Sequence, residues 1–417
     1  ETQGKETGLS EEEKGMKVSV FLNCEGERRK VGMLDDEMGI RFQYTDDFVD
    51  APLPLSPVAL PTSSRVWQGN QRLNDGLPGI VADSLTDGWG NLLLDRQLTR
   101  KGRRLTEISP LERLCWVGSQ GMGALEYEPE TRLEAFEPQS IRLDTLADNV
   151  DRVLSEASDT GVLDQLSSLN GSSGGARPKI VCLVADDGSG ELRRGMMPEP
   201  GFSPWLIKFH SASDDRDQGV QEFICSELMR AAGISVTETR LFESAKVPGW
   251  FGIRRFDRNE KGKLHMATAA GLLDCDFRTP CLDYQSILAL TQRLVAGKEA
   301  LVEQIKRCAF NFLIGNNDDH AKNFSFLMNS SGAWQVSPAY DMVTAAGMGG
   351  EHMTALLGKG KNPRVDDFLA LAGMFDLSSR EVKTALGEVC TAVAQYPELA
   401  RQYGVKVPAA VRFEFLR

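Results

Sequence analysis

Apolar and polar residues alternate through the first part of the chain, in the segments KVSVFLN, RKVGMLDD and GIRFQYTD of residues 16–45. Gly, Asn and Asp separate these segments. Alternation with a period of two is typical of strands that bury one face. The pattern predicts a small unit of short antiparallel strands. The proline-rich run at 51–61 fits neither a helix nor a central strand, so an extended connector is expected there.

The spacing of apolar residues changes between residues 85 and 175, where they recur at steps of three and four, as in LDTLADNVDRVLSEA. This is the period of an amphipathic helix. Two apolar strands are then predicted in ARPKIVCLV and SPWLIKFH, separated by the hairpin-like DDGSGE. A helix near 219–232 and a strand at 250–258 follow them.

Helical periodicity dominates the second half of the chain, in DYQSILALTQRLV, KEALVEQIKRCAFNFLI, VDDFLALAGMF and SREVKTALGEVCTAVAQY. The predicted fold class is therefore α+β. We expect a mixed β/α N-terminal region at 16–150, a lobe with strands and a phosphate loop at 151–258, and a mainly helical lobe at 259–417. Residues 1–15 are polar, and a solvated tail or a remnant of cloning is expected there.

Composition narrows the class of protein. The 417 residues include 41% apolar ones, enough for two or three packed cores. A net charge of −12 argues against a general affinity for nucleic acid, because such binding depends on Lys and Arg. No apolar run approaches the roughly 20 residues of a membrane helix, so a soluble, cytoplasmic protein is expected. The eight cysteines show no CxxC spacing, and buried, reduced thiols are expected.

The densest group of polar residues lies in FNFLIGNNDDHAKNFSFLM at 310–328, between a predicted helix and a predicted strand. Asp318 and Asn323 have the D-x-x-x-x-N spacing with which kinase catalytic loops place an Asp beside a metal-binding Asn. Asp318 could accept a proton from a hydroxyl while Asn323 offers an oxygen to Mg²⁺. The spacing alone also fits an Asp that caps a turn. Asp319 is the rival base, one residue short of this spacing.

Two more charged residues fit the same chemistry. Asp341 follows Asn323 by 18 residues, after a predicted hairpin, where a second metal-binding carboxylate is expected. Lys208 lies in the apolar strand PWLIKFH, and a buried ammonium is costly without a partner. It could face phosphates, or point to solvent from an edge strand. Glu222 could pair with Lys208, or simply favour the start of its helix.

Two further segments carry weaker signals. The loop NGSSGGARPK at 170–179 has three glycines, so its amides could approach an anion, with Lys179 adding a cation at its end. A flexible linker is the alternative. In IRRFDR at 253–258, backbone groups of Arg254 to Phe256 could face adenine, and Asp257 could accept from ribose. An ordinary strand with a salt-bridged Asp is the alternative.

The segments GARPK, LIKF, RRFDR, NNDDHAKNFS and YDM, in this order, resemble the HipA family of bacterial toxin kinases over roughly residues 17–380. The resemblance implies a HipA-like kinase fold with a nucleotide-binding N-lobe and a helical C-lobe. It also implies transfer of the γ-phosphate of ATP, with Mg²⁺, to serine or threonine. Expected partners are a HipB-like helix-turn-helix antitoxin, DNA only through that antitoxin, and a substrate such as an aminoacyl-tRNA synthetase.

The same resemblance implies roles for matching residues. Asp318 would be the catalytic Asp, Asn323 and Asp341 would bind the metal, and Ser172 or Ser173 would be autophosphorylated. His320 replaces the lysine that eukaryotic kinases carry after the catalytic Asp, and could steady the γ-phosphate or orient the loop. The residues expected to bind the nucleotide are Gly174, Gly175, Ala176, Lys179, Lys208, Arg254, Phe256 and Asp257. Arg177 departs from the usual Gln of the family and adds charge beside the phosphates.

Two other functions stay open from the sequence. A small-molecule or lipid kinase would need the same metal and base, although no basic membrane-facing helix favours lipid. A corepressor that acts through a bound antitoxin would need no kinase chemistry. The presence of Lys208, Asp318, Asn323 and Asp341 argues against an inactive site.

Overall fold

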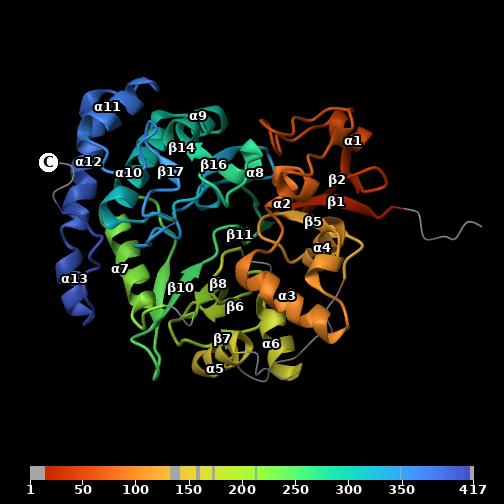
Figure 1. Cartoon of the computed structure of the whole chain (residues 1–417), viewed down its shortest axis with the longest axis horizontal. Helices are drawn as coiled ribbons and strands as arrows, with labels where there is room; N and C mark the ends of the chain where they lie inside the picture. The colour runs from red at the N-terminus through yellow and green to blue at the C-terminus, as the bar shows by residue number, and fades with distance from the viewer. Residues whose placement is uncertain are drawn as a thin grey trace, which may run out of the picture.

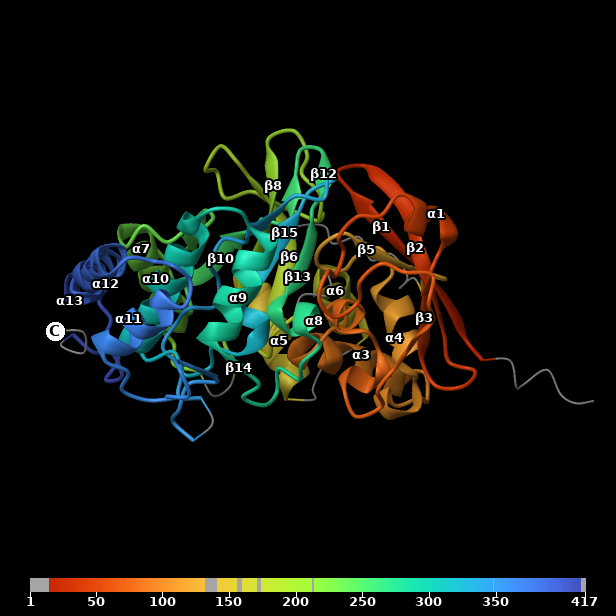
Figure 2. The ribbon, with the colours of Figure 1, turned by 90° about the horizontal axis from the view of Figure 1, so that it is seen from above.

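The computed structural model describes residues 15–131, 141–155, 160–170, 174–211, 214–347 and 349–413. The tail expected at 1–15 therefore lies outside the described residues except for Gly15, as do Ser172 and Ser173. The N-terminal sheet lies at one end of the molecule and the last helices lie at the other, with the second sheet between them (Figures 1 and 2).

The N-terminal unit is built on a five-stranded sheet with the order β4-β3-β2-β1-β5. Its strands are β1 (Lys17–Cys24), β2 (Glu27–Asp35), β3 (Arg41–Tyr44), β4 (Trp67–Gln68) and β5 (Leu125–Glu128). Every second residue of β1 is buried, from Val18 to Cys24, as the alternation predicts. The turn from β1 to β2 uses Glu25 and Gly26, both with positive φ, which suits a tight hairpin.

Helices lie between β3 and β5 in the sequence. They are α1 (Asp46–Asp50), α2 (Gly79–Ala82), α3 (Gly88–Arg100) and α4 (Pro110–Val117). Of these, α1 contacts β2, and α4 contacts β1 and β5. Ser109 caps α4, because its side chain accepts from the backbone N–H of Glu112 at 3.1 Å, and Pro110 occupies the first turn. Residues 51–61 form neither helix nor strand, as expected for the proline-rich run.

A second five-stranded sheet, with the order β7-β6-β8-β10-β9, forms the middle of the molecule. Its strands are β6 (Lys179–Ala185), β7 (Leu192–Arg193), β8 (Phe202–Lys208), β9 (Thr239–Phe242) and β10 (Trp250–Arg254). Apolar side chains of α3, α5 (Leu143–Leu154) and α6 (Thr160–Asn170) share one core with this sheet. The helix α7 (Gln218–Ala231) contacts β9 and β10.

The strand predicted at 250–258 is shorter than expected, and this part of the prediction was wrong. β10 ends at Arg254, and a separate β11 (Arg258–Asn259) pairs with β12 (Gly262–Lys263). The chain leaves the sheet between them because the carboxylate of Asp257 is turned into a buried ion network with Arg255 and Arg258.

The last third is mainly helical, as predicted. Its helices are α8 (Ala269–Leu273), α9 (Tyr284–Leu294), α10 (Lys298–Ile314), α11 (Val365–Gly373), α12 (Ser379–Val393) and α13 (Tyr396–Gln402). A small sheet of β13 (His265–Thr268), β15 (Ser325–Met328) and β16 (Trp334–Val336) lies among them. β14 (Leu282–Asp283) pairs in parallel with β17 (Thr354–Ala355).

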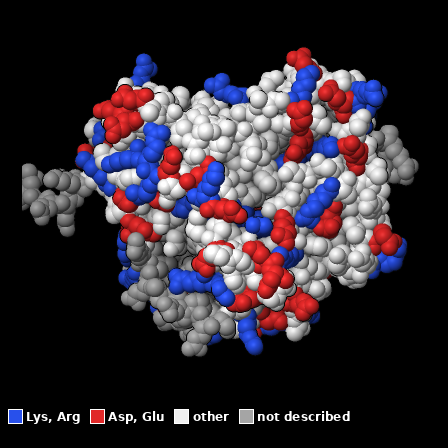
Figure 3. Space-filling model, turned by 180° about the vertical axis from the view of Figure 1, so that it is seen from behind, with Lys and Arg blue, Asp and Glu red and all other residues white. Residues whose placement is uncertain are grey.

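Three further features concern the length of the helices, the charge on one face and the exposure of the cysteines. Among the described residues, no helix has both the length and the apolar character that crossing a membrane requires. Figure 3 shows Lys and Arg interspersed with Asp and Glu over the face turned away from Figure 1, so the net negative charge is not gathered there. Cys281 is exposed and Cys275 and Cys390 are half-buried, so the expectation of buried thiols was wrong for these three.

Candidate active site

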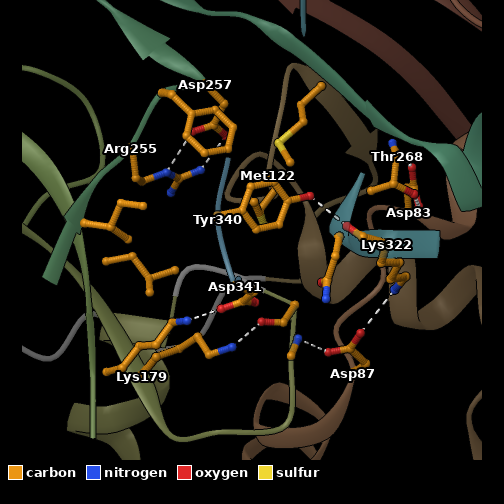
Figure 4. A pocket seen from close by; sticks show the side chains of 18 of the residues that line it. Asp83, Asp87, Met122, Lys179, Arg255, Asp257, Thr268, Lys322, Tyr340 and Asp341 are labelled. Atoms are coloured by element: carbon orange, nitrogen blue, oxygen red, sulfur yellow. Dashed lines mark hydrogen bonds and ion pairs between the residues drawn. The ribbon is translucent and has the colours of Figure 1, made fainter. Parts of the chain in front are cut away.

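A pocket lies where the N-terminal unit, the second sheet and the helical part meet (Figure 4). Its lining residues are Asp83, Asp87, Met122, Gly174, Gly175, Lys179, Leu206, Lys208, Glu222, Ile253, Arg254, Arg255, Phe256, Asp257, Met266, Thr268, His320, Lys322, Asn323, Tyr340 and Asp341. These residues are widely separated in the sequence. The pocket therefore exists only when all three parts of the chain are folded together.

Lys208, the last residue of β8, points into this pocket. Its ammonium forms ion pairs with Glu222 of α7 and with Asp341, and its side chain is only 11% exposed. Burial alone would lower the pKa of Lys208, but the carboxylates of Asp341 and Glu222 outweigh burial and raise that pKa. Lys208 therefore carries a positive charge at the bottom of the pocket. Its pairing with Glu222, one of two alternatives in the sequence analysis, is present.

Asp341 adopts an uncommon backbone conformation, with φ of 53°. A non-glycine residue in this left-handed region is usually held there by its surroundings. The side-chain amide of Asn316 donates to the carbonyl of Asp341 at 3.4 Å. Burial would raise the pKa of Asp341, but Lys208 and Lys179 hold it below its ordinary value. The carboxylate is thus ionised and directed at the pocket.

The loop after α10 separates the two neighbouring aspartates. Gly315 ends the helix with a φ of 69°, which favours glycine. Asp319 is completely buried, and its carboxylate accepts hydrogen bonds from Tyr284 at 3.1 Å, His352 at 3.0 Å and the backbone of Thr354 at 3.2 Å. Burial raises the pKa of Asp319 in spite of these partners. Asp319 therefore fixes the loop and is not accessible to a substrate.

Asp318, in contrast, is exposed, and it does not line the pocket itself. Asn323 donates from its side-chain amide to the backbone carbonyl of Asp318 at 2.9 Å, while the side-chain oxygen of Asn323 receives no hydrogen bond from a described residue. The loop thus leaves the carboxylate of Asp318 accessible, and it leaves the side-chain oxygen of Asn323 without a hydrogen bond from a described residue.

His320 and Lys322 lie on the pocket side of the same loop. The ring of His320 packs against Phe277 with 5.5 Å between ring centroids, and its Nδ1 is buried without a partner among the described residues. The ammonium of Lys322 lies 4.2 Å from the centroid of the Phe277 ring. The two roles predicted for His320 both stay predictions.

Asp87 of the N-terminal unit joins two segments of the site, and sequence analysis missed it. Its carboxylate pairs with Lys322 at 3.1 Å and accepts a hydrogen bond from the backbone N–H of Gly175. Asp87 stands at the N-cap position of α3, yet its side chain makes no capping hydrogen bond to that helix. The carboxylate is therefore committed to the pocket rather than to its own helix.

The glycine loop closes one side of the pocket before β6. Gly175 has a φ of 97°, and a side chain at Gly88 would come within 2.3 Å of Ala176, so α3 packs tightly on the loop. Lys179 is buried and donates to the carbonyl of Gly174. Burial lowers the pKa of Lys179 to about 8. The described part of this loop is thus fixed by contacts rather than a free linker.

The opposite end of the pocket is formed by the residues after β10. Arg254 is exposed, and Phe256 packs against Tyr340 with 5.6 Å between ring centroids. Asp257 is 2% exposed, and its carboxylate is bound by Arg255, by Arg258 and by the backbone N–H of Gly123 at 2.8 Å. The structure shows the salt-bridged arrangement for Asp257, and a ribose contact stays a prediction.

The site offers oxygen ligands for a hard cation. Among the described residues there is no cluster of three or more His, Cys, Asp and Glu that could bind a metal. Asn323 and Asp341 nevertheless both line the pocket, and the second carboxylate oxygen of Asp341 has no partner among the described residues. Mg²⁺ often takes only one or two protein oxygens and completes its shell with phosphates and water. This pair of residues fits such a site.

Comparison with known protein families assigns both parts of the chain. A model described as the HipA-like C-terminal domain matches residues 171–396, and a model described as the HipA N-terminal domain matches residues 22–128. The first match alone covers more than half of the chain.

Curated relatives are distant. "Putative kinase Y4dM" of Sinorhizobium fredii is 28% identical over 155 residues, which is 34% of this chain and 37% of that protein. "Toxin YjjJ" of Escherichia coli is 24% identical over 291 residues, which is 66% of this chain and 61% of that protein. The chain thus matches less than two thirds of the length of these relatives.

A solved structure shows the same fold over nearly the whole chain. It is a complex of the toxin–antitoxin system of Shewanella oneidensis MR-1, with HipA, HipB and operator DNA. The TM-score is 0.66 at 17% identity, and the match covers 93% of this chain and 90% of that one. The α+β, HipA-like fold predicted from the sequence is therefore confirmed.

Proposed function

The chain belongs to the HipA family, and on that premise we propose that it is a kinase that uses ATP and Mg²⁺ to phosphorylate serine or threonine hydroxyls. One observation carries the proposal. Lys208, Asn323 and Asp341 come from distant parts of the sequence and line one pocket, beside a glycine loop that ends in Lys179. Two cations and two metal-type oxygens at one end of a partly apolar pocket suit a nucleoside triphosphate.

In this proposal the phosphates lie at the end of the pocket that holds Lys179, Lys208 and the loop of Gly174 to Ala176. Backbone amides and ammonium groups there would neutralise the triphosphate. The base would lie toward Arg254 and Phe256. Met122, Leu206 and Ile253 line the pocket and offer apolar contacts for its ring.

Asn323 and Asp341 would hold Mg²⁺, which when bound neutralises charge on the phosphates. Asp318 would accept the proton of the acceptor hydroxyl, because it is exposed beside Asn323 whereas Asp319 is buried and fully bonded. Lys322 would approach the transferred phosphate from its pair with Asp87.

We propose domain boundaries at 16–150, 151–258 and 259–417.

The partner we propose is a small HipB-like antitoxin that binds DNA, as in the complex of the Shewanella structure. In this proposal the chain is the toxin of the pair, and the name of the relative "Toxin YjjJ" supports that role. A translation protein such as an aminoacyl-tRNA synthetase is the proposed substrate, and Ser172 or Ser173 is the proposed site of autophosphorylation. These finer statements rest on the family alone.

Incubation with γ-labelled ATP and Mg²⁺, followed by phosphoamino-acid analysis, tests the proposal. Label on phosphoserine or phosphothreonine of the protein itself, or of a protein in an added cell extract, is the expected result. Label found only in small molecules or lipid would replace the proposal by another kinase class. ATP that binds without any transfer would favour a corepressor.

A further inference from the structure

Two thiols lie together beside the catalytic loop. The segment 274–281 joins α8 to β14, and the sulfur atoms of Cys275 and Cys281 are 2.9 Å apart. Their sequence spacing matches no common metal or redox motif. The structure alone reveals that they are neighbours.

Both cysteines are held in place by the backbone. The N–H of Cys275 donates to the carbonyl of Ala270 at 3.0 Å, directly after α8. Cys281 immediately precedes β14, whose Leu282 and Asp283 pair with β17. Between them, Asp276 accepts from the backbone N–H of Arg278 at 3.0 Å and so shapes a turn. The two sulfurs are therefore brought together by the fold and need no large movement to bond.

The pair is also accessible to a small reagent. Cys281 is exposed and Cys275 is half-buried, whereas Cys24, Cys115, Cys182, Cys225 and Cys308 are buried. The hydrogen bond between the two thiols lowers the pKa of Cys281 and raises that of Cys275. Cys281 is the more exposed of the two and is thus the thiol that meets an oxidant first.

We propose that Cys275 and Cys281 form a reversible dithiol–disulfide site. With hydrogen peroxide as the oxidant, the Cys281 sulfur attacks one oxygen and the O–O bond breaks; the sulfenic acid forms, and the proton of the Cys281 thiol goes to the leaving hydroxide, which departs as water. The Cys275 sulfur then attacks the sulfenic sulfur and the S–O bond breaks; the proton of the Cys275 thiol goes to the leaving hydroxide, which departs as a second water. The two thiols lose two electrons, and the peroxide gains them. A dithiol reductant reverses the reaction by exchange.

The disulfide would fix the segment that supports the catalytic loop. Phe277 lies between the two cysteines, and its ring contacts His320 and the ammonium of Lys322. Phe277 and Cys275 also line a second pocket that shares Asp87 and Lys322 with the first. Oxidation would therefore restrain movement of Phe277 away from these side chains. This consequence rests on the proposed kinase site, whereas the disulfide itself does not.

A tryptic map of the intact protein tests the disulfide. Trypsin cleaves after Lys263, Arg278 and Arg293, so the reduced protein yields the separate peptides 264–278 and 279–293. After hydrogen peroxide and blocking of free thiols, digestion without reductant is expected to give these peptides joined, with loss of two hydrogens. Dithiothreitol should restore both separate peptides.

Variants make the test specific. Cys281→Ser is expected to lose the joined peptide completely, and Cys390→Ser, a change at another cysteine that is not buried, is expected to keep it. The proposal is overturned if wild type keeps separate peptides while Cys281 is oxidised to sulfinic or sulfonic acid, or if peptides join only between molecules. Because the map does not measure phosphotransfer, its failure is distinguishable from failure of the proposed kinase function.

Discussion

Two clusters of buried charge lie at opposite ends of one pocket (Figure 4). The phosphate cluster is formed by Lys179, Lys208, Glu222 and Asp341, and the hinge cluster by Arg255, Asp257 and Arg258. Both contain the same kinds of residue. They differ in whether each charged group has an ion-pair partner within the described part of the protein.

In the hinge cluster the protein supplies nearly every partner. Asp257 is bound by both arginines, and Arg258 also donates to the carbonyls of Gly121 at 2.8 Å and Gly123 at 3.0 Å. The cluster thereby ties the N-terminal unit to the segment after β10. It is a structural joint in which both arginines pair with Asp257, although Arg255 Nη1 and Arg258 Nε are buried without a hydrogen-bond partner among the described residues.

In the phosphate cluster, one charged group has no ion-pair partner among the described residues. Lys179 has no carboxylate of a described residue in hydrogen-bond contact, and burial lowers its pKa to about 8. The comparison teaches that a buried charge indicates function when its partners are incomplete, rather than by residue type alone.

The largest expected effect is on catalysis, at Asp341. Asp341→Asn should lower phosphotransfer by about 100-fold or more, because it removes charge from a proposed metal ligand worth several kcal/mol in the transition state. Stability should change by about 1 kcal/mol or less, because the side chain of Asp341 is 38% exposed and Lys208 keeps Glu222 as a buried counter-charge. Steady-state kinetics and thermal unfolding measure the two effects. Full activity would show that the phosphate cluster does not bind the metal.

The next effect is on stability, at Asp257. Asp257→Asn leaves Arg255 and Arg258 without a buried counter-charge and should lower the free energy of unfolding by about 3–5 kcal/mol. Urea denaturation measures it. Glu191→Gln is the control, because Glu191 pairs with Arg193 on the surface at 2.8 Å and should cost about 1 kcal/mol or less. Equal losses in the two variants would erase the contrast between a structural joint and a surface pair.

A smaller effect is expected at Asp87, which couples the two parts of the site. Asp87→Asn should lower kcat/KM for ATP by about tenfold, because losing one charged contact costs about 1.4 kcal/mol. Asp164→Asn is the matched control. Asp164 of α6 pairs on the surface, at 3.0 Å, with Arg100 of α3, the helix that Asp87 precedes. If both variants behave alike, Asp87 has only a structural role. A rise in KM larger than the fall in kcat would identify nucleotide positioning.

The smallest effect is a pH dependence at Lys179. Its pKa near 8 is below that of an unfolded lysine. The Lys179 side chain is therefore protonated and positively charged below about pH 8, and it is neutral above this pH. Nucleotide affinity should therefore weaken as the pH rises through about 8. In the protein without nucleotide, burial of the charged Lys179 lowers the free energy of unfolding. This destabilisation is fully present below the pKa of the folded protein, and it disappears as the pH rises toward the pKa of an unfolded lysine. Calorimetric titration of wild type and Lys179→Met checks this, and equal pH dependence in both would contradict it.

Much of the fold could be predicted from periodicity. The helices of the last third have long, regular apolar repeats and lie where predicted, and β1 shows the expected alternation. β9 and β13 were missed, because four residues are too few for a clear period. The end of β10 was missed because it depends on the buried pairing of Asp257, which no local pattern reveals.

The site was predictable only in part. The motif around Asp318 and the resemblance to a family pointed to Lys208, Asn323 and Asp341. These three residues line one pocket, whereas Asp318 does not line it. Asp87 was missed because its partner Lys322 lies 235 residues away, and locally it reads as a helix cap. The pair of Cys275 and Cys281 was missed because their proximity is set by two backbone anchors rather than by spacing.

The most direct test of the central claim is transfer of labelled phosphate by Asp318→Asn at saturating ATP, with the melting temperature and ATP affinity measured in parallel. The control is Asp366→Asn, an exposed aspartate on α11. We expect Asp318→Asn to keep its melting temperature and ATP affinity and to lose transfer by about 100-fold or more. Transfer at the rate of wild type and of Asp366→Asn would contradict the claim that this site is a kinase site with Asp318 as its base.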